Sequence, residues 1–284
     1  MSMIALQSIL RKLVEQALEE DLGVGDLTTQ AIFPHAFKAQ AVLQAKEDLI
    51  LAGIEIPAMV FETLDPFLKF HPIAMDGEQI KTNSIIARLE GDGRSILMGE
   101  RVAINFLQRL SAIATLTSKY VVAVKDFKAR IVDTRKTTPG WRILEKYAVR
   151  VGGGHNHRFS LGTGILIKDN HVDLLGSLSG ALEKAKQFSA HPLKIEVEAR
   201  NLQEVQEALS SGADIILLDN MQPEEIKRAV EIIKGRALVE ASGGITLSNV
   251  AEVAAAGADY ISIGALTHSA PAVDICLNIE KRVK

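Results

Sequence analysis

Cysteine, aromatic side chains and long apolar runs are all scarce in this 284-residue sequence. Cys276 is the only cysteine, which excludes an intrachain disulfide and a cysteine-based zinc site and favours the reducing cytoplasm. Aromatic residues make up 5% of the chain and the pI is about 6.2, so a nucleic-acid-binding surface is disfavoured. No apolar run approaches the roughly 18 residues needed to span a membrane, and residues 1–21 lack the order of a signal peptide. We therefore expect a cytoplasmic protein with no nucleic-acid or membrane partner.

Positive charge is concentrated in one stretch of a chain whose formal net charge is -3. Residues 133–158 read DTRKTTPGWRILEKYAVRVGGGHNHR, and residues 133–171 hold seven Lys or Arg against three acids. A solvated basic face is one interpretation of such a run. The glycines and the TTPG turn favour a second interpretation, a binding site for anions. The rest of the sequence has to decide between them.

The N-terminal part of the chain mixes helical and strand patterns without strict alternation. Residues 9–18 have helical spacing and Gly23 is placed to end that helix. Short strand-like runs follow, with a helical pattern over residues 56–64, and residues 95–127 predict two helices. This part therefore predicts an α+β domain.

From residue 130 onward short apolar strands alternate with amphipathic helices. This alternation predicts parallel strands covered by helices. Its repetition over about 150 residues favours a TIM-like β/α barrel, with a doubly wound sheet as the alternative. We place the domain boundary near residue 112. The expected strands are residues 129–134, 194–199, 214–220, 236–242 and 259–264.

Each of these strands finishes on polar residues or glycine, and the carboxyl ends of barrel strands carry the chemistry of such folds. Small residues at 242–244 and at Gly264 allow backbone N–H groups to approach a phosphate. Glu198 and Asp219 are carboxylates of the kind that Mg²⁺ uses together with substrate oxygens. The remaining polar residues at these ends are Asp133, Thr134, Arg135, Lys136, Glu196, Asn220, Glu240, Thr267 and His268.

The number of cations predicts a second anionic substrate in addition to a phosphate. Five groups are expected on one side of the mouth: Arg135, Lys136, His157, Arg158 and Lys168. They exceed what a single phosphate requires and suit a small dicarboxylate held by arginine forks. The sequence lacks GxSxG, HExxH and a Cys–His pair, so a covalent nucleophile or a catalytic zinc has little support.

Several motifs together resemble the quinolinate phosphoribosyltransferase family, also known as carboxylating nicotinate-nucleotide pyrophosphorylases. They are EEDLGVGDLTT, GERVAINFLQRLSAIAT, the stretch at 133–158 quoted above, ILIKDNH, EVE, ILLDNM, ASGGI and ISIGALTHS, in order along nearly the whole chain. The resemblance implies an α/β protein with an N-terminal α/β sandwich domain over residues 1–112 and a type II phosphoribosyltransferase barrel over residues 113–270. It implies that the barrel is open or irregular. We also expect a C-terminal helix, at about 271–284, to rejoin the N-terminal domain.

The resemblance implies that phosphoribosyl pyrophosphate and quinolinate give nicotinate mononucleotide, pyrophosphate and CO₂ in NAD biosynthesis, with Mg²⁺ as cofactor. It implies a homodimer with shared active sites, in which Arg101 reaches the quinolinate of a neighbouring subunit; assembly beyond the dimer stays open. Catalytic roles fall on Lys136, Lys168, Glu198 and Asp219, of which Glu198 and Asp219 hold Mg²⁺ directly or indirectly. The implied substrate-binding residues are Arg101, Thr134, Arg135, Lys136, His157, Arg158, Lys168, Glu198, Asp219, Ser242, Gly243, Gly244, Gly264 and His268.

Three alternatives stay open at this point. One is a paralogue associated with molybdenum transport, another is a nicotinate-specific phosphoribosyltransferase, and the third is a non-catalytic barrel that binds a sugar phosphate. The full cation set argues against each of them. The sequence leaves the roles of Arg142, Lys146, Arg150 and Glu196 open.

Overall fold

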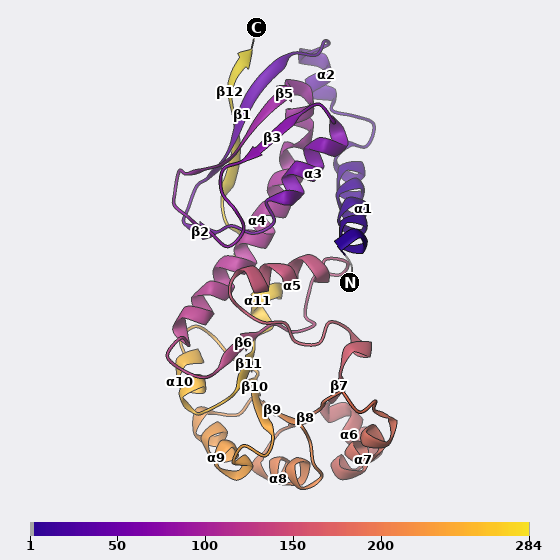
Figure 1. The fold of residues 1–284 in the computed structure, drawn as a ribbon, viewed down its shortest axis with the longest axis vertical. Coiled ribbons are helices and arrows are strands. Elements are labelled where there is room, and N and C mark those ends of the chain that lie inside the picture. The colour runs from indigo at the N-terminus through magenta and orange to yellow at the C-terminus, as the bar shows by residue number, and fades with distance from the viewer. Residues whose placement is uncertain (1–2, 284) are drawn as a thin grey trace. The chain divides into compact units, whose positions relative to one another are not determined.

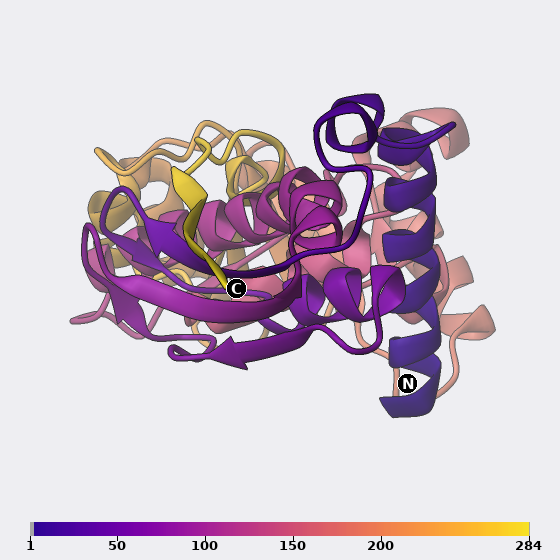
Figure 2. The same ribbon diagram turned by 90° about the horizontal axis from the view of Figure 1, so that it is seen from above.

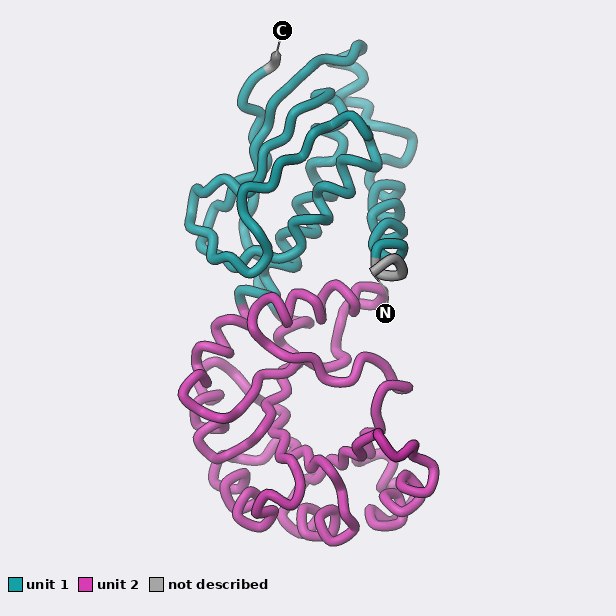
Figure 3. The backbone as a smooth tube through the Cα atoms, viewed as in Figure 1, with its two compact units in different colours: residues 1–115, 270–284 teal, residues 116–269 magenta. Residues whose placement is uncertain are grey.

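The chain divides into two compact units in the computed structural model, which describes residues 3–283 (Figure 3). Unit 1 comprises residues 1–115 and 270–284, and unit 2 comprises residues 116–269. No helix among the described residues has both the length and the apolar character needed to cross a membrane.

Unit 1 is built on a four-stranded antiparallel sheet in the order β12-β1-β5-β3 (Figure 1). In β1 (Lys38–Ala45), Ala39, Ala41 and Leu43 are at most 1% exposed because alternate side chains face the helices. The other strands are β3 (Lys69–Pro72), β5 (Ile85–Asp92), β12 (Ile275–Val283) and the separate pair β2 (Leu49–Ile50) and β4 (Gln79–Ile80).

Helices cover one face of this sheet. The first, α1 (Met3–Leu22), packs beside α3 (Glu55–Leu64) at one side of unit 1, as Figure 2 shows. A short helix α2 (Leu27–Ile32) begins at Asp26, whose carboxylate accepts a hydrogen bond from Thr29 N at 2.9 Å. The side chains of Phe61 and Phe106 are fully buried in the core of this unit.

Two expectations for these segments are wrong. The C-terminal helix expected at about 271–284 is the strand β12, which pairs antiparallel with β1. Ile275 and Leu277 are buried, but three polar residues follow at 280–282, so the segment has no sustained period of two, and its pairing with β1 defines it as a strand. The two helices expected between residues 95 and 127 are a single helix, α4 (Gly93–Ala123), because no glycine or proline interrupts its interior after Gly99.

Unit 2 contains a six-stranded parallel sheet in the order β6-β11-β10-β9-β8-β7. In the described structure β6 and β7 form its two edges, so the barrel is open, as the family resemblance implied and unlike the closed barrel that the alternation favoured. The strands are β6 (Arg130–Val132), β7 (Ile165–Ile167), β8 (Ile195–Ala199), β9 (Ile215–Asp219), β10 (Leu238–Ser242) and β11 (Tyr260–Ser262). Helices line the outer side of this curved row of strands (Figure 1).

The helices of unit 2 start and stop where the local chemistry predicts. The Asn201 side chain accepts a hydrogen bond from Glu204 N at 2.9 Å, and Pro223 is the first residue of its helix. Gly212 and Gly257 follow helix ends with φ of +74° and +102°. These helices are α5 (Arg142–Val151), α6 (Asp169–Leu175), α7 (Leu178–Phe188), α8 (Leu202–Ser210), α9 (Pro223–Ile233), α10 (Val250–Ala255) and α11 (Ala265–His268), with a 3-10 turn at Leu161–Thr163.

Candidate active site

The carboxyl ends of the parallel strands bring the predicted site residues of unit 2 to one edge of the sheet. Glu198 and Glu240 are both paired with Leu217 of the strand between them, and Asp219 is paired with Ser242. Because paired residues of parallel strands point to the same face, these polar groups share the face opposite the helices. The helix-side face is apolar and buried, with Val197, Ile216, Leu218, Val239 and Ile261 at most 3% exposed.

Lys168, Glu198 and Asp219 form one group at this edge. The Lys168 ammonium lies 3.2 Å from Glu198 Oε2, directly after β7. Burial raises the pKa of Glu198, the Lys168 charge opposes that rise, and the nearby charge of Asp219 adds to it. Two neighbouring carboxylates attract a cation and stabilise a positive charge that develops beside them.

Arg135 and Arg158 form the anion-binding side of the site. Burial lowers the pKa of Arg158, and the charge of Arg135 lowers it further, so the two guanidinium groups lie close enough to repel one another. Arg158 donates to Gly164 O at 3.0 Å. Arg135 Nε is buried and lacks a hydrogen-bond partner in the described structure. Two neighbouring guanidinium groups with an unused donor are suited to bind an anion with more than one carboxylate.

His157 uses both ring nitrogens within the protein. Nε2 lies 3.0 Å from Glu196 Oε2 and 3.5 Å from Glu240 Oε2, and Nδ1 accepts a hydrogen bond from Arg158 N at 2.8 Å. The two glutamates raise the pKa of His157 despite its burial, whereas the amide at Nδ1 favours a neutral ring with its proton on Nε2. The direct contact of His157 with a substrate anion therefore stays a prediction.

His157, Glu196 and Glu240 are the one group in the described part of the chain whose ligand atoms lie close enough together for a metal ion, all within 4.8 Å of one another. A metal at Nε2 would need the ring proton on Nδ1, which already accepts the Arg158 amide proton. Burial raises the pKa of Glu240 to about 7, with the charge of Glu196 as a further cause. The cluster is therefore better described as a histidine held in place by two buried glutamates.

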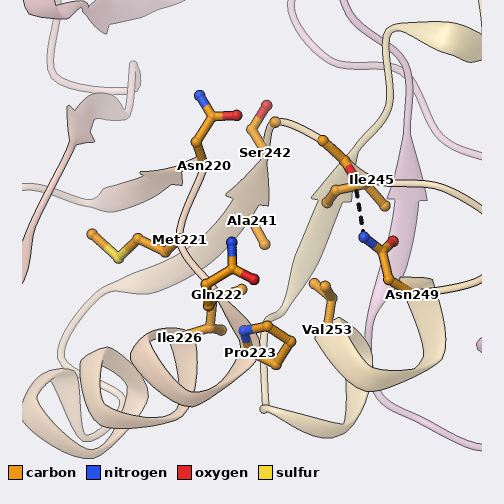
Figure 4. Close-up of a pocket in the computed structure, with 12 residues that line it drawn as sticks. Asn220, Met221, Gln222, Pro223, Ile226, Ala241, Ser242, Ile245, Asn249 and Val253 are labelled. Carbon is orange, nitrogen blue, oxygen red and sulfur yellow. Dashed lines mark hydrogen bonds between the residues drawn. The ribbon is translucent and has the colours of Figure 1, made fainter.

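The glycine loop after β10 lies at the rim of a cavity of about 190 Å³. Figure 4 shows Asn220 and Ser242 at one end of this cavity and the apolar side chains of Pro223, Ile226 and Val253 at the other. Gly243 has φ of +89°, and a Cβ there would lie 2.2 Å from Asn220 Oδ1. Only glycine therefore allows this backbone to pass so close to the end of β9.

A second glycine brings Lys136 and His268 together. A Cβ on Gly264 would lie 2.9 Å from Lys136 Cδ and 3.2 Å from the His268 ring. Thr267 Oγ1 donates to Lys136 O at 2.8 Å, which ties the loop after β6 to α11. Thr134 Oγ1 accepts from Lys136 N at 3.0 Å within the same loop. The predicted cation and the predicted phosphate loop are thus neighbours.

Arg101 belongs to a different unit from the other predicted site residues. It is an exposed residue of α4 within unit 1, whereas the other thirteen predicted site residues belong to unit 2. Its predicted role concerns a neighbouring subunit and stays a prediction.

Sequence reasoning missed several polar side chains that the structure places at the site. The role of Lys146, which the sequence left open, becomes clear in the structure, where it is buried with Asp133. Arg142, whose role the sequence also left open, donates to Arg135 O at 3.3 Å and to Phe159 O at 3.2 Å. Thr138 donates to the buried Glu145 carboxylate through Oγ1 and N. Residues 142, 145 and 146 lie on one face of α5, and only the packed structure shows that this face points inward.

The fold and site define a class of protein: an open parallel α/β domain that binds small polyanions at the carboxyl ends of its strands. Comparison with known proteins narrows that class. Residues 26–111 match the N-terminal domain, and residues 113–278 the C-terminal domain, of quinolinate phosphoribosyl transferase. The chain belongs to the quinolinate phosphoribosyl transferase family.

Individual relatives agree over nearly the full length. A probable carboxylating nicotinate-nucleotide pyrophosphorylase of Bacillus subtilis is 43% identical over 95% of this chain and 93% of its own. Its namesake from Methanocaldococcus jannaschii is 44% identical over 94% and 96%. The crystal structure of NadC from Streptococcus pyogenes has a TM-score of 0.90 at 41% identity, covering 95% of this chain and 96% of that one.

Proposed function

We propose that this chain transfers the phosphoribosyl group of phosphoribosyl pyrophosphate to quinolinate, releasing pyrophosphate and CO₂ and forming nicotinate mononucleotide. The observation that carries the proposal is the pair of guanidinium groups of Arg135 and Arg158, with an unused buried donor on Arg135. Quinolinate carries two adjacent carboxylates, and such a pair matches that anion. The carboxylating relatives described above support the same reaction.

Arg135, Arg158 and Lys168 hold the quinolinate carboxylates, and His157 belongs to the same wall of the site. Lys136, with Thr134 in its loop, and His268 bind the phosphates of the second substrate together with the small residues at Ser242, Gly243, Gly244 and Gly264. Backbone N–H groups of such loops are good donors to phosphate oxygens. Dense positive charge is needed because both substrates are anions.

Glu198 and Asp219 serve the ribose. As the bond to pyrophosphate lengthens, positive charge develops on the ribose, and fixed carboxylates stabilise that charge. The pyridine nitrogen of quinolinate then bonds to C1 of the ribose and becomes a cation. As CO₂ leaves, the electron pair of the bond to the neighbouring carboxylate stays on the ring carbon, where the adjacent positive nitrogen stabilises it until the carbon takes up a proton. No covalent enzyme intermediate is needed.

We further propose Mg²⁺ as the cofactor of this site. The adjacent carboxylates of Glu198 and Asp219 fit it, because Mg²⁺ takes one or two carboxylates together with substrate oxygens. When bound, Mg²⁺ neutralises charge on the leaving pyrophosphate. Both residues are candidates to hold it directly or through water.

The proposal includes a cytoplasmic homodimer in which Arg101 of one subunit completes the quinolinate site of the other. A two-fold dimer would then contain two shared sites. The exposure of Arg101 on α4 is compatible with this role.

The reaction is tested by incubating the protein with phosphoribosyl pyrophosphate, Mg²⁺ and quinolinate labelled at the C2 carboxylate. We expect one labelled CO₂ for each nicotinate mononucleotide formed. Binding of both substrates without turnover would instead indicate a non-catalytic sugar-phosphate barrel. Equal turnover of nicotinate, which has a single carboxylate, would indicate the nicotinate-specific alternative.

A further inference from the structure

A buried ion pair connects the loop after β6, which carries Arg135, with the segment at residues 155–158, which carries Arg158. Asp133 follows β6 directly, and Lys146 lies on α5; their side chains are 0% and 4% exposed. The Lys146 ammonium donates to Asp133 Oδ1. Burial raises the pKa of Asp133 and lowers that of Lys146, while their mutual contact opposes both shifts.

Both residues of this pair also form hydrogen bonds with residues 156 and 157. Asp133 Oδ1 accepts from His157 N at 2.9 Å, and Oδ2 accepts from the Asn156 side-chain amide. Lys146 Nζ donates to His157 O at 3.1 Å, and its backbone carbonyl accepts from Asn156 Nδ2 at 2.9 Å. Both backbone polar groups of His157 are therefore bound by this one ion pair.

The two segments also meet through their backbones. Asp133 N donates to His155 O at 3.1 Å, and His155 N donates to Ile131 O at 2.9 Å. Arg135 follows Asp133 by two residues, and Arg158 follows His157 directly. Asp133 is thus two residues before Arg135, and the ion pair is hydrogen-bonded to the backbone of His157, the residue before Arg158.

The close approach of the two guanidinium groups is electrostatically unfavourable by itself. Arg135 and Arg158 carry like charges and repel each other before any anion is bound. A buried ion pair, in turn, contributes little stability compared with apolar side chains of the same size. A function in positioning explains its presence better than a function in stability, because rigid anchors keep the two cations together.

We propose that Asp133 and Lys146 are positioning residues that hold Arg135 and Arg158 at the separation required by a dicarboxylate substrate. They act through the backbone of His157 and through the chain after β6. The identity of the dicarboxylate as quinolinate rests on the proposed function; the positioning itself does not.

Three variants test the proposal: Lys146→Met, Asp133→Asn and the double variant. Lys146→Met leaves a buried carboxylate without its cation, so we expect a lower thermal midpoint and a quinolinate KM raised roughly tenfold or more, with a smaller change in kcat. In the double variant no buried charge is left unpaired, so the thermal midpoint should recover. Its KM should stay raised, because His157 O still lacks the ammonium donor.

Arg150→Met is the matched control, since Arg150 is an exposed residue one turn further along α5. It should leave KM and the thermal midpoint unchanged. Hydrogen exchange of the peptide covering residues 152–164 should be faster in Lys146→Met and in the double variant, and unchanged in the control. A double variant that recovers stability together with a wild-type KM and wild-type exchange would overturn the proposal.

The exchange measurement also separates this proposal from the proposed function. If the wild-type protein neither binds nor turns over quinolinate, the proposed reaction is wrong. Faster exchange in the double variant would then still support the positioning role, and unchanged exchange would reject it.

Discussion

The Lys168 ammonium lies 3.2 Å from the Glu198 carboxylate, and the two residues belong to the carboxyl ends of neighbouring parallel strands. Glu198 is 8% exposed in its side chain, whereas Lys168 is 47% exposed. The Lys168 side chain is therefore partly open to solvent, while its charge favours the ionised form of a buried carboxylate.

We expect Lys168→Met to reduce kcat/KM by on the order of 100-fold and to change its pH profile. Burial raises the pKa of Glu198 and Lys168 opposes that rise, so loss of the ammonium raises the pKa further. The carboxylate then becomes protonated at a higher pH, and the acidic limb of kcat/KM should move upward. Lys184→Met, at an exposed position of α7, is the control. An acidic limb at its wild-type position would contradict the coupling.

Glu198→Gln and Asp219→Asn should affect kcat more than quinolinate affinity. Each amide keeps the shape of the side chain but removes the charge that stabilises the developing cation on the ribose. We expect kcat to fall roughly 100-fold or more, with quinolinate dissociation constants from calorimetry within about threefold of wild type. Loss of quinolinate binding with an intact kcat would show that these residues belong to the quinolinate pocket.

Glu240→Gln should make folding stability less dependent on pH. The folded-state pKa of about 7 is above the ordinary value of 4.5, so the unfolded chain loses this proton first as the pH rises. The stability that Glu240 contributes is therefore complete below about pH 4.5 and is lost as the pH rises through 7. The free energy of unfolding of the variant, relative to that of the wild type, should rise by up to about 3 kcal/mol between pH 5 and pH 8.

Thermal unfolding of both proteins across this range measures the difference, and Glu231→Gln at an exposed position of α9 provides the control. A gain that is larger at pH 5 than at pH 8 would mean that Glu240 is ionised and paired in the folded protein.

Arg158→Ala should retain the fold and lose the preference for quinolinate. Removing one charge-assisted contact to a carboxylate lowers kcat/KM for quinolinate by roughly 100-fold. Nicotinate lacks the second carboxylate, so its slow turnover should change much less, and the ratio of the two rates should fall. Rates with both substrates, beside a thermal unfolding curve, measure this. Wild-type selectivity in a folded variant would place the specificity elsewhere.

Mixed dimers of Arg101→Ala and Lys168→Ala should recover activity that neither variant shows alone. With shared sites, one site of a mixed dimer inherits both defects and the other inherits neither. Random exchange makes about half of the dimers mixed, so roughly a quarter of wild-type activity should return. The variants are refolded together, exchange is confirmed by mass, and turnover is assayed. No recovery despite exchange would place Arg101 in the site of its own chain.

Much of unit 2 was predictable from local patterns. Five of its strands were expected from short apolar runs. Asn201, Gly212, Pro223 and Gly257 lie at helix ends and are residue types that local capping favours there. The sixth strand, β7, has only three residues between Gly164 and Lys168, which is too short for a periodicity to be visible. Likewise, β12 was taken for a helix, because an edge strand is defined by its partner β1.

The sequence alone determined which chemical groups are present and their order along the chain. It placed cations at 135, 136, 158 and 168, carboxylates at 198 and 219, and glycines where a backbone must pass closely. Only the tertiary structure decided which of them meet: Lys146 with Asp133, His157 with Glu196 and Glu240, and Arg135 with Arg158. Burial and charge pairing depend on contacts between residues far apart in sequence, and no local pattern records those contacts.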